Sequence, residues 1–86
     1  MKGSLVMALA GRDKDRLFFV TDDIDENFVE IADGRSRRLE KPKVKKIKHI
    51  KLISDETELG SDIREGRPVT NQKLRRAISE WQAIHQ

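Results

Sequence analysis

The sequence contains no cysteine and no tyrosine, and its only aromatic residues are one tryptophan and three phenylalanines. Without cysteine, neither a disulfide framework nor a thiolate metal site can stabilise the fold. The absence fits a reducing compartment, and we expect a cytoplasmic protein. No apolar run approaches the roughly 20 residues that a membrane-spanning helix needs, so we expect no contact with a membrane. A chain of 86 residues is sufficient for one small domain.

Patterns of catalytic and metal-binding residues are also missing. His49 and His85 are the only histidines, and no third ligand stands at a usual spacing from either. The segment 23–27 begins like a calcium loop, but Phe28 and Gly34 occupy the positions of its glycine and its final glutamate. No serine has the nearby histidine and acid that would activate a nucleophile. We therefore expect no enzymatic activity, no cofactor and no metal site.

Positive charge is concentrated in one block of the sequence. Nine of the 18 basic side chains lie between Arg35 and Lys51, where Glu40 is the one acid, so the block carries a charge of about +8. The rest of the chain is acidic, at about −5. Such asymmetry is typical of a surface that binds a polyanion. The alternative is a solvated charge run, but interleaved apolar residues such as Leu39 and Ile47 allow this block to fold.

The first third of the chain predicts three short strands. Residues 5–10 are apolar on both alternating faces, as in a buried strand. Residues 1–10 also have the outline of a signal peptide, but their apolar part is shorter than the roughly 7–15 residues required, so we favour the strand. A turn over Gly11–Asp15 leads into a second strand over 16–21, and an acidic turn leads into a third over 28–32.

The basic block predicts two further strands. Asp33-Gly34 is a two-residue hairpin signal, which places a fourth strand over 36–40 that ends before Pro42. In residues 44–53 the apolar spacing is first three and then two, so that both a helix and a strand are open. The β-branched content favours a strand from about Ile47, with a bulge or bend ahead of Ile50.

The last third of the chain predicts a linker and a helix. Residues 54–69 are polar and acidic, and indicate a linker or a weak helical turn. Thr70 is a suitable N-cap for a helix over 70–86, in which an apolar stripe recurs at helical spacing: Leu74, Ala77, Ile78, Trp81 and Ile84. The stripe needs a partner, which is the sheet or a second subunit. We predict a mainly β domain over 1–53, a small five-stranded barrel, followed by a C-terminal α-helix.

Two groups of residues resemble the KOW family of RNA-binding proteins. Residues 3–6 with 10–14 and a hydrophobic second strand resemble the KOW motif. Asp15 stands where many such sequences have glycine, a mild departure if Asp15 takes the left-handed conformation. The block from Ala32 to His49 is similar to small bacterial KOW proteins and to the archaeal and eukaryotic large-subunit ribosomal protein numbered fourteen. The resemblance covers residues 3–53 and implies an SH3-like barrel that holds ribosomal RNA.

The charge pattern and the resemblance together predict a ribosome-associated protein that binds structured RNA, without excluding contacts to ribosomal proteins. The block contains no aromatic residue for base stacking, which favours recognition of RNA shape and phosphate positions. The alternative is a KOW module that docks on a ribosome factor or RNA polymerase. The sequence leaves the oligomeric state open. The predicted RNA-binding residues are Arg12, Lys14, Arg16, Arg35, Arg37, Arg38, Lys41, Lys43, Lys45, Lys46, Lys48, His49 and Lys51.

Overall fold

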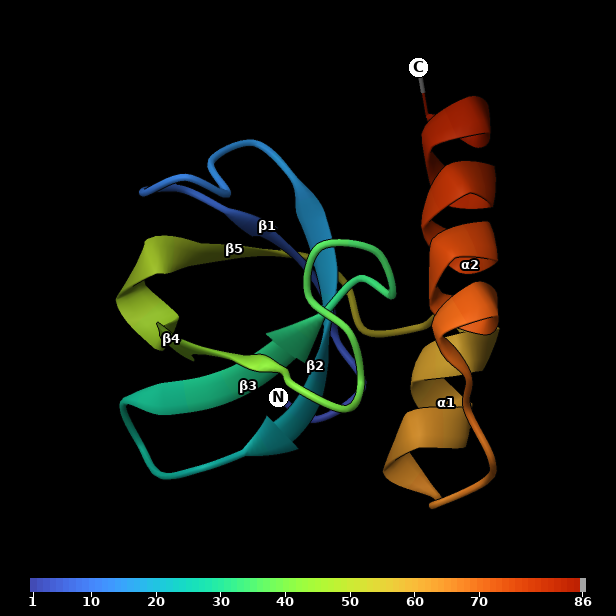
Figure 1. The fold of residues 1–86 in the computed structure, drawn as a ribbon, viewed down its shortest axis with the longest axis horizontal. Helices are drawn as coiled ribbons and strands as arrows, with labels where there is room; N and C mark the ends of the chain where they lie inside the picture. The colour runs from blue at the N-terminus through green and yellow to red at the C-terminus, as the bar shows by residue number, and fades with distance from the viewer. Residues whose placement is uncertain (86) are drawn as a thin grey trace.

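Five strands form one antiparallel sheet in the computed structural model, which describes residues 1–85 (Figure 1). The strands are β1 (Leu5–Ala8), β2 (Leu17–Asp23), β3 (Phe28–Ala32), β4 (Lys43–Lys46) and β5 (Ile50–Ser54). A 3₁₀ turn, η1 (Ile47–His49), joins β4 to β5, and helices α1 (Glu58–Arg64) and α2 (Asn71–Ile84) follow. The strand order is β4-β3-β2-β1-β5, so β4 and β5 are the two edges. The prediction of a small, mainly β fold with a C-terminal helix is confirmed.

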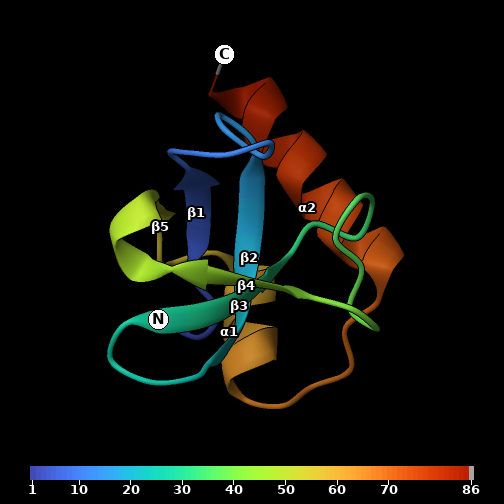
Figure 2. The same ribbon diagram turned by 60° about the vertical axis from the view of Figure 1, so that its left-hand side comes forward.

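The sheet coils strongly, and Figure 2 shows β3 and β4 running across β1 and β2. Two irregularities contribute to this shape. The register of β2 against β3 shifts between Val20 and Asp22, and the register of β1 against β5 shifts between Leu5 and Val6. Bulges of this kind increase the local twist of a strand pair. The coiling gives the sheet a concave and a convex face.

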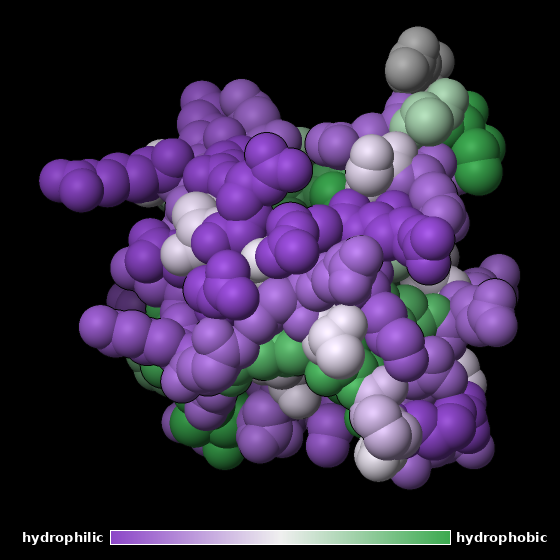
Figure 3. Space-filling model, turned by 45° about the vertical axis from the view of Figure 1, so that its right-hand side comes forward, coloured by the Kyte–Doolittle hydropathy of each residue, from purple (hydrophilic) through white to green (hydrophobic). Residues whose placement is uncertain are grey.

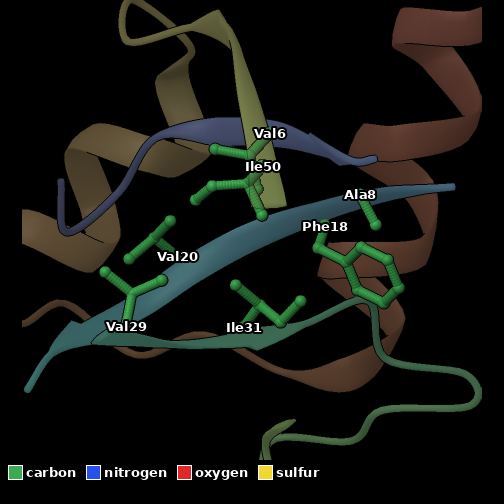
Figure 4. Packing of buried hydrophobic residues seen from close by; sticks show 7 residues of the cluster. All are labelled: Val6, Ala8, Phe18, Val20, Val29, Ile31 and Ile50. Carbon is green, nitrogen blue, oxygen red and sulfur yellow. The ribbon is translucent and has the colours of Figure 1, made fainter. Parts of the chain in front are cut away.

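The concave face holds the first of two hydrophobic clusters. Figure 4 shows its side chains pointing toward one another from four strands: Val6, Ala8, Phe18, Val20, Val29, Ile31 and Ile50. All seven are buried. Because alternate residues of a strand point to opposite faces, their neighbours in sequence lie on the convex side.

The convex face is covered by the two helices, which both lie on the same side of the sheet (Figure 1). Leu5 and Phe19 from the strands are buried there against Leu59 and Ile63 of α1 and Leu74 of α2. Strand β1 is therefore covered on both faces, which explains why it is apolar on both of them. The predicted buried strand at residues 5–10 is confirmed, although it ends at Ala8.

Helix α2 begins where the sequence predicts. The Thr70 hydroxyl accepts a hydrogen bond from the Lys73 amide at 3.1 Å, which confirms the N-cap. Leu74 is fully buried, and Trp81 packs against the same cluster while its ring stacks on His85 at a centroid distance of 3.8 Å. Ile84 is 77% exposed, so the last turn of the apolar stripe has no partner within residues 1–85. The convex face of the sheet is thus the partner of the stripe.

The segment predicted as an acidic linker or weak turn contains the seven-residue helix α1. Thr57 caps it by accepting a hydrogen bond from the Gly60 amide at 3.0 Å. Gly60 lies against the backbone of Gly3, at a separation where a side chain on either residue would overlap the carbonyl oxygen of the other. Glycine at both positions lets α1 approach the start of β1 closely.

The predicted fourth strand over 36–40 is wrong, because these residues belong to a ten-residue loop, 33–42, and the fourth strand is β4 after Pro42. Asp33-Gly34 does not form a two-residue hairpin turn. Instead, the Asp33 carboxylate accepts hydrogen bonds from the Arg35 and Arg37 amides, both at 2.9 Å. Side chain–backbone bonds of this kind compete with a strand ladder.

The predicted fifth strand begins later than expected. Residues 47–49 form η1, and β5 starts at Ile50, so the bend expected ahead of Ile50 is a 3₁₀ turn. The helix that the spacing of Val44, Ile47 and Ile50 left open does not form. Asp15 has the left-handed conformation, with a φ of 70°, under which its departure from the KOW pattern is mild, and Gly11 in the same turn has a φ of 81°.

Candidate nucleic-acid interface

Asp33 organises the loop that carries the first half of the basic block, which we call the basic loop (residues 33–42). Its carboxylate is buried, with the residue only 6% exposed. Besides the two loop amides, it accepts hydrogen bonds from the Ser36 hydroxyl at 3.3 Å and from Arg16 Nη2 at 3.2 Å. Arg16 precedes β2, so Asp33 fixes the conformation of the basic loop and also joins it to the first hairpin.

Asp13 makes a second connection between the same two parts of the chain. It lies in the loop between β1 and β2, which we call the first loop (residues 9–16), and is only 4% exposed. Its carboxylate accepts a hydrogen bond from Arg37 Nη2 at 3.1 Å, and Arg16 Nη1 lies 3.9 Å from it. Two buried acids thus hold two arginines, Arg16 and Arg37, between the first loop and the basic loop. Charge-assisted bonds of this type fix geometry more strongly than neutral ones.

Lys45 connects β4 to the first loop. It lies opposite Val29 in the register of β3 and β4, and therefore points toward the concave face. Its ammonium group donates to the Ala10 carbonyl oxygen at 2.9 Å. The side chain of Lys45 thus reaches from the edge strand across to the first loop. This contact places the first loop next to β4.

Helix α2 holds the other side of the basic loop. Arg75 Nη1 donates to the Gly34 carbonyl oxygen at 2.6 Å, and the Asn71 side chain accepts from the Leu39 amide at 2.8 Å. The Asn71 amide also donates to Glu40. This bond, with a second one from Arg38, lowers the pKa of the Glu40 carboxyl below its usual value. Sequence reasoning missed Asn71 and Arg75, since nothing in the local pattern of α2 indicates a bond to a loop more than 30 residues away.

Four of the thirteen predicted residues are engaged by other protein groups. Arg16 and Arg37 are bound by the buried aspartates, Lys45 by a carbonyl, and Arg38 pairs with Glu40 at 3.2 Å on the surface. His49 is half-buried, and its carbonyl oxygen accepts from the Leu9 amide at 2.8 Å. Eight others have side chains without an ion pair or hydrogen bond to residues 1–85: Arg12, Lys14, Arg35, Lys41, Lys43, Lys46, Lys48 and Lys51.

The predicted residues do not lie on a single flat surface. The contacts above bring the first loop, the basic loop and Lys45 together, and Lys43 lies opposite Ile31 on the same face of β4 as Lys45. Lys46 and Lys48 border a separate hollow of about 380 Å³ beside Phe28, and Lys51 lies on β5 at the opposite edge strand. The 3₁₀ turn η1 replaces the first part of the strand predicted from about Ile47, so Lys48 lies on this turn and Lys51 on β5. The basic groups instead follow the long β3–β4 hairpin and continue along η1.

The face formed by the basic loop and α2 is hydrophilic over most of its area. Figure 3 shows this side of the molecule, with hydrophobic atoms reaching the surface mainly in small patches and near the C-terminal end of α2. A second hollow, of about 440 Å³, is bordered by Arg38, Lys41 and Lys43, with Glu40 as its one acid. Phosphate groups are the natural partners of such a surface, because lysine and arginine neutralise them and release counterions.

No protein-family model matches this chain, and no curated protein matches it. Within residues 1–85, no three acidic or histidine side chains lie close enough together to hold a metal ion. Neither helix in the described part of the chain has the length and apolar character needed to cross a membrane.

Proposed function

We propose that this protein is a non-enzymatic, ribosome-associated protein of the KOW kind that binds structured RNA, with ribosomal RNA as its partner in the cytoplasm. In this proposal the coiled sheet is an open SH3-like barrel. The five antiparallel strands around one concave core, and the 3₁₀ turn that joins the two edge strands, support that description.

One observation carries the proposal: two buried aspartates fix the basic loop against the first loop, and cations without protein partners remain around them. Asp13 and Asp33 bind Arg16 and Arg37, whereas Arg12, Arg35 and Lys41 are exposed and make no ion pair within residues 1–85. A solvated charge run has no need of a fixed backbone. A surface that matches the phosphate positions of a folded RNA requires one.

The first test is the salt dependence of binding to a folded RNA hairpin. Each phosphate contact contributes a slope of about −0.7 to −0.9 in a plot of log affinity against log salt concentration. Contacts by five or more of the eight available cations predict a slope of about −4 or steeper. A slope near zero, or affinity for unstructured RNA equal to that for the hairpin, contradicts the proposal.

A protein partner is the second candidate, and one observation favours it. A hollow of about 250 Å³ lies between α1 and α2, lined by Leu59, Trp81 and the exposed Ile84, with glutamates 56, 58 and 80 around it. Binding to ribosomal proteins or RNA polymerase that survives nuclease and high salt, and that Ile84→Glu abolishes, would favour this candidate. Loss of every partner after nuclease treatment argues for the RNA-binding function alone.

A further inference from the structure

A hollow of about 270 Å³ lies where the first loop, the basic loop and α2 meet. Three arginines from these three segments border it: Arg16, Arg35 and Arg75. They are 19 and 40 residues apart in sequence, and only the folded chain brings them together. Its volume is close to the lower end of the roughly 300–1,000 Å³ of small-molecule sites, so it has room for one small ligand and not for a strand of RNA.

The arginines are held in place but retain most of their donors. Arg75 is fixed by its bond to the Gly34 carbonyl, and Arg16 by its bond to Asp33. A guanidinium group has five N–H donors, and these bonds use one donor of each. The Arg35 side chain has no hydrogen bond to residues 1–85. The hollow therefore presents many guanidinium donors, which match the oxygens of a phosphate group.

Two carboxylates border the same hollow and limit its charge. Asp33 is already surrounded by four donors, and Asp15 is exposed in the first loop. Three arginines against two aspartates leave a formal charge of +1 at the hollow. This balance suits a single phosphate group better than a run of several.

The remaining lining residues suit a nucleoside. Leu17 and Ile78 supply apolar surface, while Ser79 and Gln82 supply a hydroxyl and an amide that make no hydrogen bond within residues 1–85. Arg75, Ile78, Ser79 and Gln82 recur at helical spacing, so one face of α2 forms this wall. Glutamine amides hydrogen-bond to base edges, and arginine planes stack on unpaired bases.

We propose that this hollow binds one unpaired nucleotide of the RNA, with its phosphate on the three arginines and its base against Leu17, Ile78 and Gln82. The inference rests on the proposed RNA-binding function and deepens it. It adds α2, which lies outside the region of KOW resemblance, to the RNA-binding surface. The basic block has no aromatic residue on which a base could stack. The hollow would allow the protein to distinguish a bulged RNA from a regular duplex without one.

The direct test is an NMR titration of the protein with adenosine monophosphate, in parallel with inorganic phosphate and with adenosine. We expect saturable shifts at Arg35, Arg75 and Ile78 with the monophosphate, and weaker binding of either half alone. Shifts spread over the lysines of β4 and η1 with none at the hollow would overturn the inference. Equal affinity for inorganic phosphate and the monophosphate would also overturn it, because the base would then contribute nothing.

Neighbouring arginines on α2 provide the matched variants. Arg75→Ala removes a guanidinium group that borders the hollow. Arg76→Ala removes a guanidinium group that lies 3.8 Å from Glu80 and does not border the hollow. Loss of charge-assisted bonds predicts about tenfold weaker binding of the monophosphate for Arg75→Ala and no change for Arg76→Ala. Arg35→Ala, which removes no bond within residues 1–85, gives the same loss without affecting the fold. Equal effects of Arg75→Ala and Arg76→Ala contradict the site.

The two proposals fail separately. A folded RNA hairpin could bind with steep salt dependence while a single-nucleotide bulge in it brings no gain in affinity. In that case the nucleotide site in the hollow is wrong and the RNA-binding function is still supported. If the bulge brings a gain that Arg75→Ala abolishes and Arg76→Ala preserves, both stand. If no folded RNA binds at all, the RNA-binding function itself is wrong.

Discussion

Arg37 donates to the buried carboxylate of Asp13 at 3.1 Å, although the two residues stand 24 positions apart in the sequence. This pair joins the first loop, which follows β1, to the basic loop, which follows β3. The side chain of Arg37 is 31% exposed, whereas the side chain of Asp13 is 6% exposed. The same contact therefore neutralises one positive charge and fixes the loop on which the others are displayed.

Asp13→Asn tests this structural role. The substitution keeps the shape of the side chain but removes its charge, so the bond to Arg37 becomes weaker. We expect a loss of about 1–2 kcal/mol in the free energy of unfolding, measured by urea denaturation. Asp15→Asn is the control, since Asp15 is exposed and asparagine tolerates its left-handed conformation. Equal stability of the two variants would show that the Asp13–Arg37 pair does not hold the loops.

Gly34→Ala tests the contact of the basic loop with α2. Gly34 has a φ of 77°, and an added Cβ would overlap the backbone carbonyl of Asn71. The left-handed conformation costs about 1–2 kcal/mol and the overlap about 1–3 kcal/mol more. Gly66→Ala is a matched control, because Gly66 has a φ of 73° but open space around it.

The difference between the two glycine variants isolates the contact from the backbone conformation. We expect Gly34→Ala to lower the free energy of unfolding by about 3 kcal/mol or more, and Gly66→Ala by about 1 kcal/mol. Thermal denaturation of both variants measures this. Similar losses in the two would mean that the loop can move away from α2 at no cost.

The link between Glu40 and Asn71 predicts a dependence of stability on pH. Hydrogen bonds from Asn71 and then from Arg38 lower the Glu40 pKa from its usual value of 4.5. The folded state then binds this proton less readily than the unfolded state. The stabilisation is present above about pH 4.5 and is lost as the pH falls through the lower pKa of the folded protein.

Glu40→Gln removes this titration. We expect the parent protein to exceed the variant in stability at about pH 6 and the difference to shrink toward about pH 3. Denaturation at a series of pH values measures the difference. A difference that stays constant with pH assigns the loss to packing or hydrogen bonding and not to the carboxylate charge.

The sequence predicts the elements that depend on local pattern. The strands at residues 5–8, 17–23 and 28–32 and the cap of α2 at Thr70 follow from alternation, turn residues and helical spacing. The fourth strand could not be placed, because residues 36–40 are held by a buried acid and by Asn71, which lies 32 residues beyond Leu39. Tertiary bonds of this kind override local propensity. Where helix α1 forms, the sequence predicts only a linker or a weak helical turn, because the segment is polar, acidic and interrupted by Gly60 and Gly66.

The candidate site could be predicted in composition but not in geometry. The concentration of lysine and arginine is visible by counting, whereas the division into bound and unbound cations is not. That division depends on Asp13 and Asp33, whose burial follows from the packing of two loops. Arg75 is one of several basic residues on α2, and its contact with Gly34 depends on how the helix crosses the sheet.

The most direct test of the central claim is RNA affinity after charge reversal at exposed cations. Arg37 and Lys45 are unsuitable targets because they hold the loops together. The test variant carries Lys41→Glu, Lys46→Glu and Lys48→Glu, all at exposed residues without a protein partner in the described chain. The control carries the same charge change elsewhere, at Lys2, Lys73 and Arg76.

Binding of a folded RNA hairpin is measured by fluorescence anisotropy over a range of salt concentrations. The account predicts that the test variant loses most of its affinity and that its salt slope becomes shallower by about two to three, while the control keeps the slope of the parent. Equal affinities and slopes for the test and control variants would contradict the account, because binding would then depend on total charge and not on this surface.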